Sequence, residues 1–338
     1  MSAETDAPPS LFGRWSDVLG HQRVLGALRR AVAHDRPHHA YCFLGPRGVG
    51  KKTVSRALVS ALLCDGPGSE PCGACAACRQ LAGGTHTGVH VIEPGGKSNS
   101  ISVDQIAEIQ RQLAYRRLEG SWRVVLIDDA GSMNDSAQNK LLKTLEEPPE
   151  GTVLILCALH PGQLLQTVRS RCQKLGLGVV PTDDVERWLI ETQGAEPTAA
   201  REAAIGSRGV PGQALELLDP EASTERRERL QRLAHALAGD PGALAETVGL
   251  VDRDKEGCGL VLQTLQELLR DAMVRQAGSE AALVHPDVEI RGGPLVTLTA
   301  PALATWAQRI EDVQEKLDRN VHPGGLLEDL LQRLRAVA

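Results

Sequence analysis

Short apolar runs alternate with amphipathic stretches through the first half of the chain. The run 40–44 (Ala-Tyr-Cys-Phe-Leu) is bounded by polar residues, which is typical of a buried strand. A helix is predicted from about 51 to 64, because apolar side chains recur there at helical spacing: Val54, Ala57, Leu58, Ala61 and Leu62. Further β-branched runs predict strands at 89–92, 124–127 and 153–156. Strands that alternate with helices in this way favour a mostly parallel sheet with helices on both faces.

The pattern changes after about residue 181. Strand-like runs disappear, apart from a possible short strand near 294–298, and amphipathic helical segments take over. The segments with helical spacing, the first of them interrupted at 209–212, are 201–218, 225–237, 260–275, 301–317 and 325–338. We therefore predict three domains: an α/β domain at 1–180, a small helical domain at 181–222 and a helical C-terminal domain at 223–338.

Composition narrows the class of protein by exclusion. The 42% of hydrophobic and 24% of charged residues are ordinary for a soluble globular chain. A net charge of −6 argues against a surface that grips nucleic acid all over, and an aromatic content of 2% argues against base stacking on aromatic side chains. No apolar run is long enough to span a bilayer and no signal peptide opens the chain, so we expect a cytoplasmic protein without a membrane partner.

A glycine-rich turn lies between the first predicted strand and the helix that follows it. Its sequence, Gly-Pro-Arg-Gly-Val-Gly-Lys, is a phosphate-binding loop whose key residues are Gly45, Gly48, Gly50 and Lys51. Glycines let backbone N–H groups surround phosphate oxygens, and the lysine reaches the outer phosphates. The next residue should be Ser or Thr, whose hydroxyl ligates Mg²⁺. Here it is Lys52, with Thr53 one place late, so an ammonium stands where the metal is expected.

The second nucleotide-binding element should be an apolar strand that ends in an acidic pair. The run 124–127 followed by Asp128 and Asp129 supplies it. The first acid would hold Mg²⁺ through water. The second acid is normally Glu, which polarises the attacking water, and Asp129 is one methylene shorter, so catalysis should suffer strongly. The sequence therefore predicts a site that can hold a phosphate but is poorly equipped to cleave one; ATP bound without turnover and an empty site both stay open.

Four cysteines follow the predicted helix in a C-x7-C-x2-C-x2-C array: Cys64, Cys72, Cys75 and Cys78. In a reducing compartment such a cluster indicates a metal before a disulfide. Four thiolates can close a tetrahedral Zn²⁺ site without an open position, which is typical of a structural site. We therefore predict a zinc knuckle over 64–78. An iron–sulfur cluster is the main alternative, and buried free cysteines are a weaker one.

Three further segments identify a family. A phosphate loop followed by a four-cysteine knuckle occurs here with 15–21 (Trp-Ser-Asp-Val-Leu-Gly-His), 141–149 (Leu-Leu-Lys-Thr-Leu-Glu-Glu-Pro-Pro) and 170–172 (Ser-Arg-Cys). Over at least 14–215 the chain resembles the clamp-loader subunits of bacterial DNA polymerase III, the gamma/tau and delta-prime group. The resemblance implies an AAA+ P-loop α/β domain with an inserted zinc knuckle, a helical lid domain and an all-α collar domain. It also implies that Arg171 is a finger that acts in trans on the ATP site of a neighbouring subunit.

The departures from the active ATPases of this family point in one direction. Besides Lys52 and Asp129, the sensor strand at 156–159 lacks its threonine, and Gly212 stands at the position of the lid's sensor arginine. By resemblance this is the pattern of a delta-prime subunit, with an intact finger and little or no hydrolysis of its own, so whether the chain is itself an enzyme stays open. The alternatives are a gamma-like active ATPase motor and a zinc-dependent binding module unrelated to replication.

The resemblance also implies partners. These are the gamma/tau and delta subunits, with the sliding clamp and primer–template DNA reached through the complex. The predicted helix at 102–112 and the residues after it lie where family members approach the duplex, so Arg111, Arg116 and Arg117 are candidates for phosphate contacts. A solvated basic patch explains the same three arginines equally well.

Overall fold

The computed structural model describes residues 10–95, 100–114, 122–278, 283, 292–318 and 321–337. The chain divides into two compact units. The first comprises Met1–Gly194 and Arg208–Gln213, and the second comprises Ala195–Ser207 and Ala214–Ala338. Among the residues described, none of the helices has the length and apolar character needed to cross a membrane.

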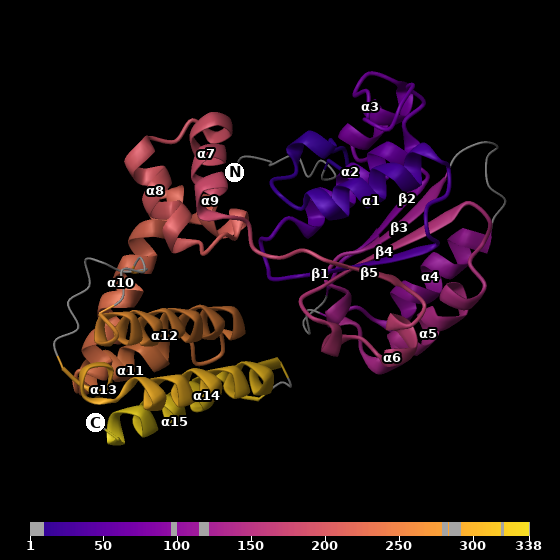
Figure 1. Cartoon of the computed structure of the whole chain (residues 1–338). Helices are drawn as coiled ribbons and strands as arrows, with labels where there is room; N and C mark the ends of the chain where they lie inside the picture. Colours follow the sequence, from indigo (N-terminus) through magenta and orange to yellow (C-terminus); the bar gives the residue numbers. More distant parts are fainter. Residues whose placement is uncertain are drawn as a thin grey trace, which may run out of the picture. The chain divides into compact units, whose positions relative to one another are not determined.

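The first unit is built on a five-stranded parallel sheet with the strand order β2-β3-β4-β1-β5 (Figure 1). Its strands are β1 (Ala40–Leu44), β2 (Val89–Ile92), β3 (Arg123–Ile127), β4 (Thr152–Ala158) and β5 (Gln173–Gly176). The register pairs Leu44 of β1 with Ala158 of β4, and Ile127 of β3 with Leu156 of β4. The carboxyl ends of β1 and β3 therefore meet at one edge of the sheet, which is where parallel α/β folds place their ligands.

Helices cover both faces of this sheet. On one face lie η1 (Trp15–Asp17), α1 (Gln22–Ala33), α2 (Lys51–Leu63) and α3 (Ala76–Ala82). On the other lie α4 (Val103–Ala114), η2 (Ala130–Ser132), α5 (Asp135–Glu146) and α6 (Gln166–Arg169). The short η3 (Pro161–Gln163) precedes α6, and α7 (Thr182–Gln193) follows the sheet.

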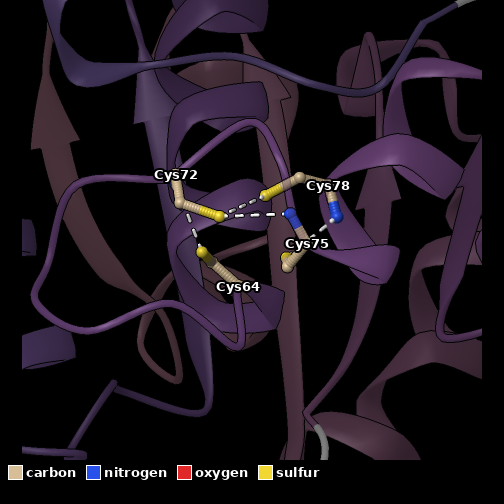
Figure 2. Close-up of side chains that lie close together, drawn as sticks. All are labelled: Cys64, Cys72, Cys75 and Cys78. Carbon is tan, nitrogen blue, oxygen red and sulfur yellow. Dashed lines mark hydrogen bonds between the residues drawn. The ribbon is translucent and has the colours of Figure 1, made fainter.

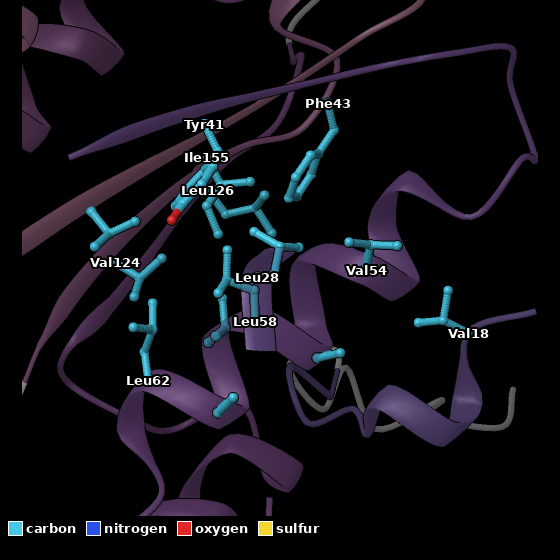
Figure 3. Close-up of a cluster of buried hydrophobic side chains, with 14 of the residues drawn as sticks. Val18, Leu28, Tyr41, Phe43, Val54, Leu58, Leu62, Val124, Leu126 and Ile155 are labelled. Carbon is cyan, nitrogen blue, oxygen red and sulfur yellow. The ribbon is translucent and has the colours of Figure 1, made fainter. Parts of the chain in front are cut away.

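Alternation along the strands gives each face its own core, because successive side chains point to opposite sides. Tyr41 and Phe43 of β1 pack with Leu28 of α1 and Leu58 of α2 on one side (Figure 3). Cys42 packs on the other side, in the cluster formed with α4, α5 and α6. Each large apolar side chain buried in this way stabilises the fold by ~1.5–3 kcal/mol. The two cores hold the sheet edge, and the loops that follow β1 and β3, in place.

The second unit contains helices and connecting loops, without a strand among its described residues. It contains α8 (Pro197–Gly206), most of α9 (Pro211–Leu218), α10 (Pro220–Leu237), α11 (Pro241–Leu250), α12 (Lys255–Gln276), α13 (Pro294–Thr297), α14 (Ala300–Asp318) and α15 (Pro323–Ala336). Its core is a leucine-rich cluster that joins α10, α12, α14 and α15, with Leu233, Leu262, Leu303 and Leu331 fully buried.

The sequence predictions for the α/β part are confirmed. Strands β1 and β2 have the predicted bounds, and β3, β4 and α2 differ from theirs by at most two residues at an end. Strand β5 was not predicted, because its residues (Gln-Lys-Leu-Gly) carry no apolar run and most of them are exposed. The possible strand near 294–298 was wrong: Pro294 begins α13, consistent with the preference of proline for the first helical position.

Candidate functional site

The phosphate loop follows β1 and leads into α2, as predicted. Its backbone has positive φ at Gly48 (79°) and Gly50 (107°), a region that side-chain-bearing residues rarely adopt. Gly50 is the residue before α2, so the loop ends at a helix N-terminus. This is the usual geometry of a phosphate cradle.

Lys51 is engaged by the loop itself. Its Nζ donates to the carbonyl oxygen of Gly45 at 2.6 Å and to that of Pro46 at 2.9 Å. Burial lowers the pKa of the Lys51 ammonium, which the acids Asp128 and Asp129 partly offset. The cation that should reach a bound phosphate is thus satisfied by backbone carbonyls of its own loop.

Lys52 occupies the side of the loop where Mg²⁺ is expected. Its Nζ lies 2.9 Å from Oδ2 of Asp128 and 3.0 Å from Oε1 of Glu93. Partial burial alone would lower the pKa of Lys52, but the hydrogen bonds to Asp128 and Glu93 outweigh it and raise the pKa. The ammonium therefore stays charged and pairs with the carboxylate that would bind metal. Thr53 is the third residue of α2, one place beyond the metal-ligand position.

Glu93 is a member of this site that the sequence analysis did not identify. It directly follows β2, which pairs with β3 in parallel, so it reaches the same edge of the sheet as Asp128. The sequence feature that could have identified Glu93 is its position directly after a predicted strand.

Asp129 is turned toward a different partner. Its backbone has φ 54°, and its Oδ2 accepts a hydrogen bond from the Ser132 hydroxyl at 2.5 Å. The carboxylate that would polarise an attacking water is thus bound within its own turn. The predicted residues Lys51, Lys52, Asp128 and Asp129 lie around one sheet edge. Lys52 and Asp128 pair with each other, whereas Lys51 and Asp129 bond to their own loop and turn.

Gly212 lies directly against the phosphate loop. Its N–H donates to the carbonyl oxygen of Gly48 at 2.9 Å. A Cβ at position 212 would lie 2.7 Å from the Cα of Gly48, closer than real Cβ atoms approach. This backbone contact excludes any larger residue at position 212 in the observed geometry.

Arg171 stands apart from this loop, two residues beyond α6. Its Nη2 lies 2.6 Å from Oε1 of Glu146, the last residue of α5. Its Nη1 donates to the carbonyl oxygen of Thr167 at 2.9 Å and lies 3.5 Å from the Ser170 hydroxyl. The Arg171 side chain is 35% exposed.

The four predicted metal ligands converge. The sulfur atoms of Cys64, Cys72, Cys75 and Cys78 all lie within 4.8 Å of one another (Figure 2). Tetrahedral thiolate ligands around a zinc ion at ~2.3 Å would lie ~3.8 Å from one another, which is within this limit. The remaining four cysteines lie elsewhere and are buried: Cys42, Cys157, Cys172 and Cys258.

Backbone N–H groups surround the cluster sulfurs. Cys64 Sγ accepts from the N–H of Gly66 and of Cys72, both at 3.3 Å. Cys72 Sγ accepts from Ala74 at 3.4 Å and from Cys75 at 3.3 Å, and these two bonds lower the pKa of the Cys72 thiol to about 6. Such donors favour the thiolate form, which is the form that ligates metal, whereas burial raises the pKa of the Cys64 and Cys78 thiols. The donor set and its surroundings thus fit a structural Zn²⁺.

The knuckle is tied to the N-terminal part of the unit. The indole N–H of Trp15 donates to the Ser69 carbonyl at 2.8 Å, and Arg29 of α1 lies 3.5 Å from Glu70. Trp15 is itself buried in the core beside α2. The loop between Cys64 and Cys72 is therefore attached at its middle as well as at its ends.

One of the three DNA-contact candidates is described. Arg111 lies in the last turn of α4, is largely exposed and pairs with Glu108 at 2.6 Å. Arg116 and Arg117 lie outside the described residues.

The fold and the site together define the class of protein. A phosphate loop after the first strand of a parallel sheet and an acidic pair after a neighbouring strand make the first unit a P-loop α/β domain. The family model described as DNA polymerase III, delta subunit, matches residues 20–180.

Relatives extend the match beyond this domain. The chain is 30% identical over 328 residues to DNA polymerase III subunit delta′ of Bacillus subtilis, covering 95% of this chain and 98% of that one. It is 34% identical over 255 residues to subunit delta′ of Escherichia coli, covering 75% of each. Subunit tau of E. coli is 29% identical over 318 residues, which cover 91% of this chain but 48% of tau. The chain belongs to the delta-prime family of DNA polymerase III subunits, which confirms the predicted resemblance to clamp-loader subunits.

Proposed function

We propose that this chain is a clamp-loader subunit that completes the ATP site of a neighbouring subunit and does not turn over ATP in its own. The observation that carries the proposal is the contrast between two sites. The phosphate loop is engaged by Lys51 and Gly212 of the same chain, and Lys52 beside it pairs with Asp128. Arg171 instead has a partly exposed side chain.

The charges beside the phosphate loop support the proposal that this chain does not hydrolyse ATP. Phosphoryl transfer in P-loop proteins needs Mg²⁺ between the phosphates and the acid after the strand. Here the Lys52 ammonium lies 2.9 Å from Asp128, and a second cation at that place would meet direct repulsion. Asp129 is also turned to Ser132 and away from the role of polarising water. Both features disfavour Mg²⁺-dependent hydrolysis in this chain.

The chemistry of the arginine side chain supports the proposed role of Arg171 as a finger. A guanidinium stays charged at any working pH and can bind two phosphate oxygens at once. In trans it would stabilise the charge that develops on the transferred phosphoryl group, an effect on the order of 10³-fold or more in turnover. Arg171 has the exposure and the Ser-Arg-Cys context that this role requires.

The remaining parts of the proposal rest on family membership. We infer a lid domain at 181–222 and a collar domain at 223–338 that joins the subunits, and a cytoplasmic complex with gamma/tau and delta that loads the sliding clamp on primed DNA. Arg111, Arg116 and Arg117 would follow DNA phosphates. A Zn²⁺ held by the four cysteines would be structural, because four protein ligands leave no open position for chemistry.

The finger is tested by ATP turnover of the reconstituted loader with clamp and primed DNA. Arg171→Ala should depress turnover at least tenfold, whereas Arg187→Ala, which removes another exposed and ion-paired arginine, should leave it unchanged. Unchanged turnover with Arg171→Ala would remove the finger from the proposal. Steady ATP hydrolysis by the isolated chain, abolished by Lys51→Ala, would favour the gamma-like motor instead.

A further inference from the structure

Arg171 and Glu146 are carried by two segments that are anchored in the same core. Leu145 precedes Glu146 and is buried, and Val168 in α6 is fully buried in the cluster that contains Leu145. Cys172 follows Arg171 and is also buried there. The two charged side chains therefore leave the core from fixed points, at the C-terminal end of α5 and just after α6.

The contacts of the guanidinium fix its plane. Nη2 meets one carboxylate oxygen of Glu146 at 2.6 Å, and Nη1 meets the Thr167 carbonyl at 2.9 Å. A guanidinium has five N–H donors, so these two bonds leave other donors for a phosphate oxygen. A side chain held at two points is already oriented before it meets its substrate.

We propose that Glu146 is a positioning residue for Arg171: it holds the guanidinium in the orientation in which its remaining N–H groups are presented to the nucleotide of the neighbouring subunit. The inference rests on the proposed finger role of Arg171. Its physical basis is preorganisation, because a charged group displaced by about 1 Å loses much of its effect on a transition state.

The same ion pair could act in the opposite sense, as a latch that withholds the finger. Two features favour positioning. Glu146 uses one oxygen on one N–H group, so phosphate can bind without displacing it. The second bond, from Nη1 of Arg171 to the Thr167 carbonyl, lies within the segment that carries the finger. It moves with Arg171, so it need not break when the guanidinium binds phosphate.

Three variants of the reconstituted loader separate these roles by ATP turnover. Glu146→Ala should lower kcat about fivefold, the size expected when an exposed ion pair is lost. Glu146→Gln keeps an oxygen acceptor at the same place and should restore turnover to within about twofold of wild type. Glu147→Ala is the matched control: it removes the neighbouring exposed glutamate and should leave turnover unchanged.

A double substitution tests that Glu146 acts only through the finger. In an Arg171→Ala background, Glu146→Ala should cause no further loss, because the group that it positions is absent. A further fivefold loss there, or higher turnover with Glu146→Ala alone, would overturn the inference. If Arg171→Ala itself leaves turnover unchanged, the proposed function fails first. If Arg171→Ala lowers turnover but the Glu146 variants do not, the finger role of Arg171 is supported and the positioning role of Glu146 is wrong.

Discussion

Replacing Gly212 with alanine adds one methyl carbon where the chain has no room for it. That Cβ would lie 2.7 Å from the Cα and 3.0 Å from the carbonyl oxygen of Gly48. Both are backbone atoms of the phosphate loop, so relief cannot come from a side-chain rotation. The start of α9 has to move away from the loop.

The expected loss of folding free energy combines two destabilising terms and one opposing term. Relief of an overpacked contact costs ~1–3 kcal/mol. Moving the backbone also breaks the hydrogen bond from the Gly212 N–H to Gly48, which contributes about 1 kcal/mol. Helix propensity acts the other way, because alanine is favoured over glycine inside a helix by ~1 kcal/mol. We expect a net loss of about 2 kcal/mol, or roughly 4–8 °C in the Tm of a unit of this size.

Thermal unfolding followed by calorimetry measures this loss, and hydrogen exchange of the Gly212 amide reports the contact directly. Gly249→Ala is the control, since Gly249 is also helical but a Cβ there meets nothing within 4 Å. The control should be unchanged or slightly more stable. If Gly212→Ala is as stable as wild type and its amide stays protected, the contact with the phosphate loop does not hold the two segments together.

Three more outcomes follow from the site. Lys52→Thr removes the ammonium from Asp128 and Glu93, so adding Mg²⁺ with ATP should raise the Tm of this variant by a few degrees and leave the Tm of the wild-type chain unchanged. An equal rise in Tm for the variant and the wild-type chain would contradict the role given to Lys52. Metal analysis should find about one zinc per chain, which Cys72→Ser loses and Cys258→Ser keeps; iron with visible absorption would exclude zinc. Burial and nearby Arg123 lower the pKa of His90. The stability that the neutral His90 contributes is therefore complete above pH ~6.5 and is lost as the pH falls toward its folded-state pKa. His90→Gln should flatten the fall in Tm between about pH 7 and 5.

The parts of this protein that the sequence predicted well are those governed by local pattern. Strand β1 is a continuous apolar run beside a glycine-rich turn, and its bounds and the loop after it were both predicted. The four cysteines are close in sequence, so their spacing alone was enough to predict that they converge. In both cases short-range information determines the structure.

Features that depend on tertiary packing were missed. Strand β5 is polar and forms by pairing with β1, whose hydrogen-bonding groups it completes, so no periodicity marks it. Glu93 joins Lys52 because β2 and β3 end at the same edge, which a single sequence does not specify. Gly212 was noted for a missing arginine, yet its close approach to Gly48 follows from the path of the chain across 163 intervening positions and was not predictable.

The central claim is that this subunit supplies an arginine and does not use its own phosphate loop. The most direct measurement is ATP turnover of the reconstituted loader, with clamp and primed DNA, in which only this chain carries Arg171→Ala or Lys51→Ala. Our account predicts that Arg171→Ala depresses turnover at least tenfold while Lys51→Ala leaves it unchanged. Equal losses from the two substitutions would show that the loop between β1 and α2 is a working ATP site, and would contradict the account.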